Sequence, residues 1–167
     1  MASTDLEGAP WGVEAVGASA GGVEALTHFA AGLTPELPYA VAIVLHMPAN
    51  APSVLAKIID RCGPLPAVSA RDGAALQAGV IHVGVPDRHL VIADGRLMLS
   101  EGPSENGYHP AINALFRSAA LSFGPRPIGV LLSGVLDDGV LGTAAIRAMG
   151  GTTVVQQPED ALYPASR

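Results

Sequence analysis

Short runs of apolar residues alternate along the chain with segments in which apolar residues recur every three or four positions. Uninterrupted runs are typical of strands buried on both faces of a parallel sheet, whereas the three-and-four spacing is typical of amphipathic helices. The runs that predict strands are Val13–Val16, Ala40–Leu45, Leu65–Val68, Ile128–Leu132 and Thr152–Val155, with a further apolar stretch at Val80–Val83. This alternation predicts an α/β fold: a doubly wound, mostly parallel sheet with helices on both faces.

Four segments carry the helical spacing. Their apolar positions are Val23, Leu26, Phe29, Ala30 and Leu33; Val54, Leu55, Ile58 and Ile59; Ile112, Leu115, Phe116, Ala119 and Ala120; and a last segment through Ile146 to Met149. Ser53 is predicted to cap the second helix, and Pro110 to occupy the first turn of the third. Gly124 is predicted to end the third helix. Asp137 or Asp138 is predicted to cap the fourth.

The middle of the chain has a different pattern. Two apolar stretches, His89–Ala93 and Arg96–Leu99, flank the pair Asp94-Gly95. An Asp-Gly pair between apolar stretches favours a two-residue hairpin turn, because both central residues of that turn need positive φ. An antiparallel hairpin is therefore predicted as an insert in the otherwise parallel architecture.

The composition limits the class of protein. Of the 167 residues, 49% are hydrophobic and 14% are charged, which excludes intrinsic disorder as the dominant state. Residues 11–167 contain no repeat or linker, so we expect one domain behind a flexible leader, residues 1–10. The net charge is −6 and the chain has no basic cluster, which disfavours nucleic acid and anionic membranes as partners.

Targeting and redox signals favour the cytoplasm. Cys62 is the single cysteine, so the chain has no intramolecular disulfide and no multi-cysteine metal site. The first basic side chain is Lys57, which removes the charged start of a signal peptide. The longest apolar run, Tyr39–Leu45, is too short to span a bilayer. We expect a cytoplasmic protein without membrane insertion, metal or other cofactor.

Polar residues follow three of the predicted strands. Ser19 lies in the turn Gly-Ala-Ser-Ala-Gly-Gly after the first strand, His46 follows the second, and Asp138 follows Ile128–Leu132. Ligands of doubly wound sheets bind at the carboxyl ends of strands, so these side chains are expected to converge. Gly-x-Ser-x-Gly between a strand and a helix is typical of a nucleophile elbow. A serine nucleophile needs a base, and the base needs a partner that fixes its tautomer; His46 and Asp138 are predicted for these roles.

Simpler interpretations exist for each residue. A serine in a glycine turn is often a helix cap or part of a phosphate cradle, a histidine at a strand end is often structural, and Asp138 can cap its own helix. The order Ser, His, Asp also differs from the Ser, Asp, His order of α/β-hydrolases. The remaining histidines are interpreted as structural or solvent-facing: His28, His82, His89 and His109.

Four stretches of the chain are distinctive in combination: VGASAGGVEAL (16–26), HMP (46–48), YHPAINALFRSAA (108–120) and LSGVLDDG (132–139). Together and in this order they resemble the catalytic domain of CheB, the chemotaxis receptor protein-glutamate methylesterase. The resemblance covers nearly all of Val13–Pro164. It implies a doubly wound α/β fold that hydrolyses glutamate methyl esters on chemoreceptors and often deamidates receptor glutamines. It places the family's nucleophile at Ser19, its base at His46 and its orienting carboxylate at Asp138.

The chain departs from the family pattern at several positions. The family commonly has threonine where this chain has Ala20, and methionine where it has Val135; the resemblance gives both positions a part in binding the oxyanion. The family's Tyr-Arg-Pro-Ser is here Tyr108–Ala111, so Tyr108 and His109, together with Met47, are expected to line the substrate cleft. By the resemblance, residues 11–167 form a catalytic domain without a receiver domain, and its C-terminal end is interpreted as truncated.

Three classes of function remain open from the sequence. The first is a methylesterase that acts through the three residues above. The second is a binding or regulatory module that docks on receptors or a sensor kinase without turnover, which the changes at Ala20, Val135 and His109 favour. The third, a nucleotide-binding domain, is disfavoured because the turn at 17–22 lacks the Gly-x-Gly-x-x-Gly pattern. The expected partners are chemoreceptors as substrates, with a sensor kinase or a separate receiver domain as regulators.

Overall fold

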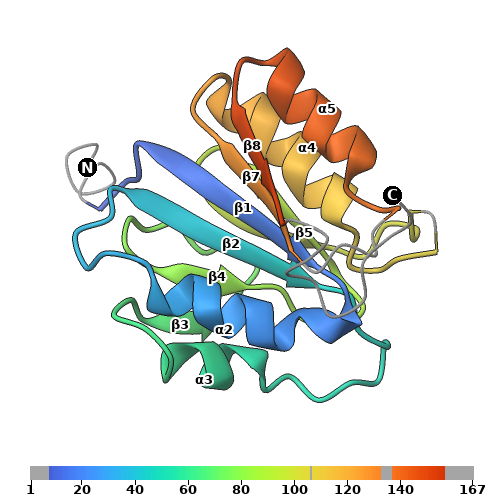
Figure 1. Ribbon diagram of the computed structural model, residues 1–167. Coiled ribbons are helices and arrows are strands. Elements are labelled where there is room, and N and C mark those ends of the chain that lie inside the picture. Colours follow the sequence, from blue (N-terminus) through green and yellow to red (C-terminus); the bar gives the residue numbers. More distant parts are fainter. Residues whose placement is uncertain (1–7, 106, 133–136, 157–167) are drawn as a thin grey trace.

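A computed structural model describes residues 8–105, 107–132 and 137–156. The elements are β1 (Gly12–Ala18), a 3₁₀ turn η1 (Ala20–Gly22), α2 (Val23–Ala31), β2 (Tyr39–Leu45), α3 (Leu55–Asp60), β3 (Ala67–Ser69), β4 (Ile81–Val83), β5 (His89–Ala93), β6 (Arg96–Ser100), α4 (Ile112–Phe123), β7 (Ile128–Leu132), α5 (Val140–Ala148) and β8 (Thr152–Val155). Figure 1 shows their arrangement.

The main sheet has six parallel strands in the order β3-β4-β2-β1-β7-β8, and β5 and β6 form a separate antiparallel hairpin. Helices α2 and α3 lie on one face of the sheet, and α4 and α5 lie on the other (Figure 1). The strand order reverses direction between β1 and β7, because β2 lies on one side of β1 and β7 on the other. The predicted doubly wound fold with a hairpin insert is therefore confirmed.

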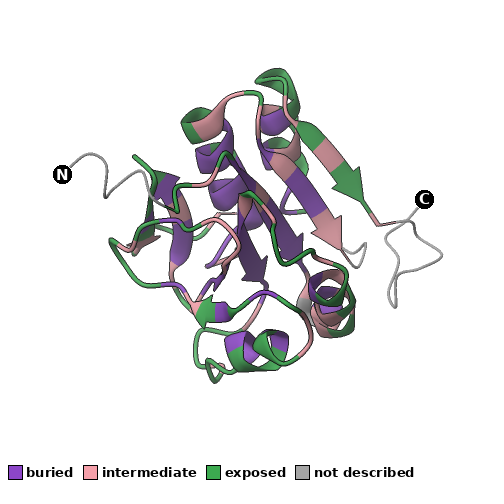
Figure 2. Cartoon of the chain, turned by 90° about the vertical axis from the view of Figure 1, so that its left-hand side faces the viewer, coloured by how far each residue is buried: buried purple, intermediate pink, exposed green. Residues whose placement is uncertain are grey.

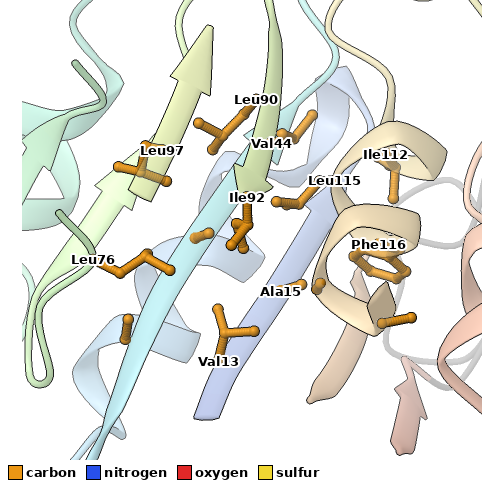
Figure 3. Packing of buried hydrophobic residues seen from close by; sticks show 14 of the residues in the cluster. Val13, Ala15, Val44, Leu76, Leu90, Ile92, Leu97, Ile112, Leu115 and Phe116 are labelled. Carbon is orange, nitrogen blue, oxygen red and sulfur yellow. The ribbon is translucent and has the colours of Figure 1, made fainter. Parts of the chain in front are cut away.

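Each face of the sheet has its own hydrophobic core, because successive side chains of a strand point to opposite faces. Val13 and Ala15 of β1 pack in the cluster under α4 and the hairpin, which Figure 3 shows from close by. Val16 and Ala18 pack in the other cluster, against α2 and α3. Figure 2 shows the central strands buried and the periphery exposed, as expected for a parallel sheet covered on both sides.

The first strand and α4 approach closely at Gly17. A Cβ atom at Gly17 would lie 2.6 Å from Cγ2 of Ile112, the first residue of α4. A side chain at this position would therefore push the helix away. Gly17, two residues before Ser19, thus allows the N-terminus of α4 to pack against the carboxyl end of β1.

The turn signals are largely confirmed. Asp94 and Gly95 have φ values of 53° and 73°, as the hairpin turn requires. Gly124 caps the C-terminus of α4 with a φ of 60°. The apolar stretch Val80–Val83 contributes β4, which lies in the main sheet between β3 and β2. The short strand predicted at Leu65–Val68 is shifted towards the C-terminus, as β3.

The predicted helix caps are wrong in three places. The N-cap of α3 is Val54, not Ser53, and it makes no side-chain cap. Helix α4 begins at Ile112, so Pro110 precedes its first turn. The N-cap of α5 is Gly139 with a φ of 113°, a conformation that favours glycine, so neither preceding aspartate caps that helix. The reason for the last difference is that the Asp138 carboxylate binds the start of α4 instead.

Of the predicted leader, residues 1–7 lie outside the described part of the chain. The carbonyl of Gly8 accepts a hydrogen bond from the amide of Ala78 at 2.8 Å, and the amide of Trp11 donates to Pro38 at 3.0 Å. In the residues that the structure describes, no helix has the length and apolar character needed to cross a membrane.

Candidate active site

The site lies at the carboxyl ends of β1, β2 and β7, where the strand order reverses. In the parallel register, Ala18 of β1 pairs with Leu45 of β2 and with Leu132 of β7. Ser19 and His46 are thus the next residues beyond paired positions on adjacent strands, which lie about 4.8 Å apart. The amide of His46 donates to the carbonyl of Ala18 at 3.0 Å, so the two strands remain side by side up to this point.

His46 and Asp138 form a buried hydrogen-bonded pair. Nε2 of His46 lies 2.8 Å from Oδ2 of Asp138, and the two residues are 8% and 0% exposed. An ionised carboxylate only accepts hydrogen bonds, so the proton of this contact is on Nε2. In the neutral ring Nδ1 is then the nitrogen that can accept a proton. The chymotrypsin-type triad pairs its aspartate with Nδ1 of the histidine instead, but both arrangements leave one ring nitrogen as a base.

The Asp138 carboxylate is held by the N-terminus of α4. The amide of Asn113 donates to Oδ1 at 2.8 Å, and the amide of Ile112 donates to Oδ2, which also binds His46. Three N–H groups therefore converge on one carboxylate. The first turn of a helix offers unpaired amides and the positive end of the helix dipole, both of which favour a negative charge here.

Asn113 makes the reciprocal contact to α5. Its Oδ1 accepts the amides of Gly139 at 2.9 Å and Gly142 at 2.7 Å, and the residue is 1% exposed. The sequence interpretation gave Asn113 no role. The signal in the sequence was an amide side chain flanked by apolar residues, Ile112 and Ala114, in the first turn of a helix.

Tyr108 covers one face of the His46 ring. The two rings are stacked, with centroids 3.8 Å apart and planes inclined by 9°. Two backbone hydrogen bonds of 2.9 Å join Tyr108 to Glu105, and the Arg117 guanidinium binds the Glu105 carboxylate at 2.8 and 3.1 Å. This contact with Glu105 raises the pKa of Arg117. Glu105 and Arg117 thus anchor the segment that carries Tyr108, and neither was singled out from the sequence.

A cleft of about 340 Å³ opens beside the His46 and Tyr108 rings. It is lined by His46, Met47, Pro48, Ala49, Asp87, Ser104, Gly107, Tyr108, His109 and Pro110. The residues expected in a cleft, Met47, Tyr108 and His109, are in its wall. Nδ1 of His109 lies 3.0 Å from the Asp87 carboxylate, so a second histidine–carboxylate pair lies at the rim.

The other histidines are structural or exposed, as interpreted from the sequence. His89 is buried; its Nε2 binds the carbonyl of Pro103 at 2.8 Å and its Nδ1 accepts the amide of Ala111 at 3.1 Å. His82 is buried in β4, and burial lowers its pKa to about 4. His28 lies on α2 with a largely exposed side chain.

Ser19 is the last residue before the 3₁₀ turn that leads into α2. It has extended backbone angles, φ −80° and ψ 175°, and its carbonyl accepts the amide of Gly22 at 2.8 Å. The chain therefore turns sharply after Ser19, and the amides at the start of the helical segment lie beside it. Ala20 begins this turn, whereas Val135 lies outside the described residues.

Comparison with known proteins identifies the family of the chain. The sequence profile described as CheB methylesterase matches residues 14–165. The chain belongs to the CheB methylesterase family. Its fold resembles the crystal structure of the Thermotoga maritima CheB methylesterase catalytic domain, with a TM-score of 0.85 and 26% identity over 91% of this chain and 82% of that chain.

Curated relatives of this CheB-family chain carry one enzyme name. The chain is 42% identical to protein-glutamate methylesterase/protein-glutamine glutaminase 3 of Anaeromyxobacter dehalogenans, over 87% of this chain and 43% of the relative. It is 36% identical to protein-glutamate methylesterase/protein-glutamine glutaminase 2 of Methanosarcina mazei, over 86% of this chain and 41% of the relative. The CheB-family chain thus spans less than half the length of these relatives.

Proposed function

We propose that the chain hydrolyses glutamate methyl esters on chemotaxis receptors, and also deamidates receptor glutamines. The observation that carries the proposal is the buried hydrogen bond of 2.8 Å between His46 and Asp138, next to the strand end that Ser19 follows. A base held by a carboxylate beside a serine is the arrangement that nucleophilic acyl transfer needs. The enzyme name of the curated relatives supports this substrate class.

In the proposed reaction, Ser19 is the nucleophile. Nδ1 of His46 takes the hydroxyl proton as Oγ of Ser19 attacks the ester carbonyl, and Asp138 stabilises the resulting imidazolium. His46 then returns the proton to the methoxy oxygen, and methanol leaves. Water, activated by the same histidine, hydrolyses the glutamyl-serine ester and regenerates the free serine. With a glutamine substrate, the leaving group is ammonia.

The oxyanion of the tetrahedral intermediate needs hydrogen-bond donors. We assign this role to the backbone amide of Ala20, at the entry to α2, because amides at the start of a helical segment are unpaired and favour negative charge. The family resemblance adds the backbone of Val135. A backbone donor does not depend on the side chain, so alanine and valine at these two positions are compatible with the proposed role.

The cleft is proposed to receive the substrate side chain. A volume of about 340 Å³ is at the lower end of the range for small-ligand pockets, so it accommodates one side chain and its ester rather than a folded segment. Met47 and His109 line this cleft, and Tyr108 holds the plane of the His46 ring. The receptor backbone is then expected to lie across the rim.

Further parts of the proposal rest on the family resemblance. We propose that residues 11–167 form the catalytic domain and that the chain acts in the cytoplasm. We also propose that a sensor kinase or a receiver domain regulates it. The receptor segment that carries the methylated glutamate is the proposed substrate partner.

Release of methanol from methyl-labelled receptor membranes tests the proposed function. Ser19→Ala should lower the rate by at least roughly a thousandfold, because the three residues act as a unit. His28→Gln, a change on the exposed side of α2, is the control and should leave the rate unchanged. Unchanged release from Ser19→Ala would exclude the covalent mechanism. Binding of receptors without any release by the unmodified protein would favour the binding module instead.

A further inference from the structure

The N-terminus of each of the helices α4 and α5 is capped by a side chain that belongs to, or lies next to, the other helix. Asp138, two residues before α5, accepts the first amides of α4, and Asn113, in the first turn of α4, accepts the amides of Gly139 and Gly142. Neither helix has a side-chain cap from its own N-cap residue. The two helices therefore satisfy each other's unpaired donors across their interface.

The side chain of Asn113 binds the chain directly beside Asp138. Its Oδ1 binds the peptide N–H of Gly139, which is the residue directly after Asp138, and a second N–H one turn along α5. The two helices approach closely at this point, because a Cβ atom at Gly142 would lie 2.6 Å from Cβ of Phe116 and 3.2 Å from Oδ1 of Asn113. The Asn113 oxygen therefore supplies the two hydrogen bonds at this end of the interface, beside the close packing of Gly142 on Phe116.

Both ends of the connection are buried. Asn113 is 1% exposed and Asp138 is 0% exposed. Without the Asn113 oxygen, the amides of Gly139 and Gly142 lose their partner inside the protein, and a buried unpaired donor is costly. The start of α5 is then expected to move towards water. Asp138 is joined to Gly139 by a single peptide bond, so its carboxylate moves as well.

We propose that Asn113 is a positioning residue for the Asp138 carboxylate. It holds Asp138 at hydrogen-bonding distance from Nε2 of His46 by fixing the N-terminus of α5. The inference rests on the proposed function for its effect on catalysis, but the position of the carboxylate relative to His46 is measurable without any substrate. Displacing a catalytic group by about 1 Å costs roughly a hundredfold in rate, which sets the upper limit of the expected effect.

The first test is kinetic and uses the full chain. Asn113→Ala should lower kcat for ester hydrolysis by roughly tenfold to a hundredfold with little change in KM, because the cleft residues are untouched. Asn113→Asp keeps an acceptor oxygen in the same place and should recover most of the loss. Ser118→Ala is the matched control. Ser118 also lies buried on α4 and also binds the amide of another element, that of Ile92 at 2.9 Å. It is far along the helix from Asp138, so kcat should not change.

The second test is spectroscopic and needs no activity. The proton on Nε2 of His46, shared with a carboxylate, is expected to give a downfield proton NMR signal, identified by its loss in Asp138→Ala. Asn113→Ala should shift or remove this signal, and Ser118→Ala should retain it. If the unmodified chain shows the signal but hydrolyses no ester, the proposed function fails while the positioning inference stands.

Two results would overturn the inference. One is an Asn113→Ala protein with the signal unchanged and kcat within about twofold of the unmodified chain, which is below the smallest loss expected from displacement. The other is an equal loss of kcat in Ser118→Ala, which would make the effect one of general destabilisation. If Asn113→Ala does not fold, Asn113→Ser is tested in its place. The serine hydroxyl is also an acceptor, but its oxygen lies one bond closer to the backbone, so we expect a smaller loss of kcat in the same direction.

Discussion

Replacing Asp138 with asparagine removes one charge and keeps the side-chain size. The carboxylate accepts three N–H groups, from His46, Ile112 and Asn113. An amide has one acceptor oxygen and one NH₂ donor, so one orientation leaves the NH₂ group facing the amide of Asn113, and the other leaves it facing Ile112 and His46. Either orientation brings donors against each other. We therefore expect Asp138→Asn to weaken both the site and the fold.

The rate effect follows from the lost charge. In the proposed mechanism His46 becomes an imidazolium beside Asp138, and two unit charges about 4 Å apart interact by about 4 kcal/mol at an effective dielectric constant of 20. At 1.36 kcal/mol per factor of ten, this corresponds to a loss of roughly a thousandfold in the rate. The same type of substitution costs about ten-thousandfold in a chymotrypsin-type serine protease, where it also traps the wrong tautomer. Here the orientation of the amide that keeps its oxygen facing Nε2 of His46 preserves the tautomer, so the loss from the charge alone, roughly a thousandfold, is expected.

The stability effect follows from the donor conflict. Leaving one buried backbone amide without an acceptor costs about 1–3 kcal/mol, and for a domain of this size each kcal/mol lowers the melting temperature by about 2–4 °C. Methanol release and thermal melting by circular dichroism measure the two effects separately. Asp137→Asn is the matched control: it makes the same chemical change one residue earlier, at an exposed position, and should alter neither quantity.

Activity of Asp138→Asn within about threefold of the unmodified chain would refute the reasoning. A loss that small, against an expected loss of roughly a thousandfold, would show that the charge of Asp138 does not act on His46 in the transition state. Loss of activity in Asp137→Asn but not in Asp138→Asn would assign the orienting role to the neighbouring aspartate. A melting temperature unchanged in Asp138→Asn would contradict the three-donor arrangement.

Two further predictions concern groups near the site and in the core. Tyr108→Leu should lower kcat by about twofold to tenfold, since the stacked aromatic contact with His46 contributes about 0.5–1.5 kcal/mol. Tyr108→Phe keeps the ring and should retain activity. An equal loss of kcat in both variants would assign the effect to the hydroxyl group instead. Burial lowers the pKa of His82 to about 4, below the value of about 6.5 in the unfolded chain. The unfolded chain therefore binds this proton more readily, and the free energy of unfolding decreases as the pH falls from 6.5 towards 4. Chemical denaturation should show a loss of about 2 kcal/mol between pH 6.5 and about pH 5, which His82→Gln, unable to titrate, should lack; parallel pH curves for the two proteins would contradict this.

Much of the fold was predictable because its signals are local. The apolar runs identified the strands of the main sheet, since a buried parallel strand needs an uninterrupted apolar sequence. Asp94-Gly95 identified the hairpin, because few other residue pairs adopt two positive φ angles in succession. The positions of Ser19 and His46 after adjacent strands followed from the same pattern, because parallel strands end at one edge.

The pairing of His46 with Asp138 was predicted, but the hydrogen bonds that hold Asp138 and the start of α5 against α4 were not, because they depend on how the two helices dock. Asp138 binds amides 25 and 26 positions earlier, and Asn113 binds amides 26 and 29 positions later. An aspartate just before a helix normally caps that helix, so the local pattern predicted the wrong partner. Which unpaired amides a carboxylate meets depends on how α4 and α5 pack on the sheet, and that packing depends on close contacts such as Gly17 against Ile112. Propensity and periodicity describe one segment at a time, whereas a buried hydrogen bond between two helices exists only after both are docked.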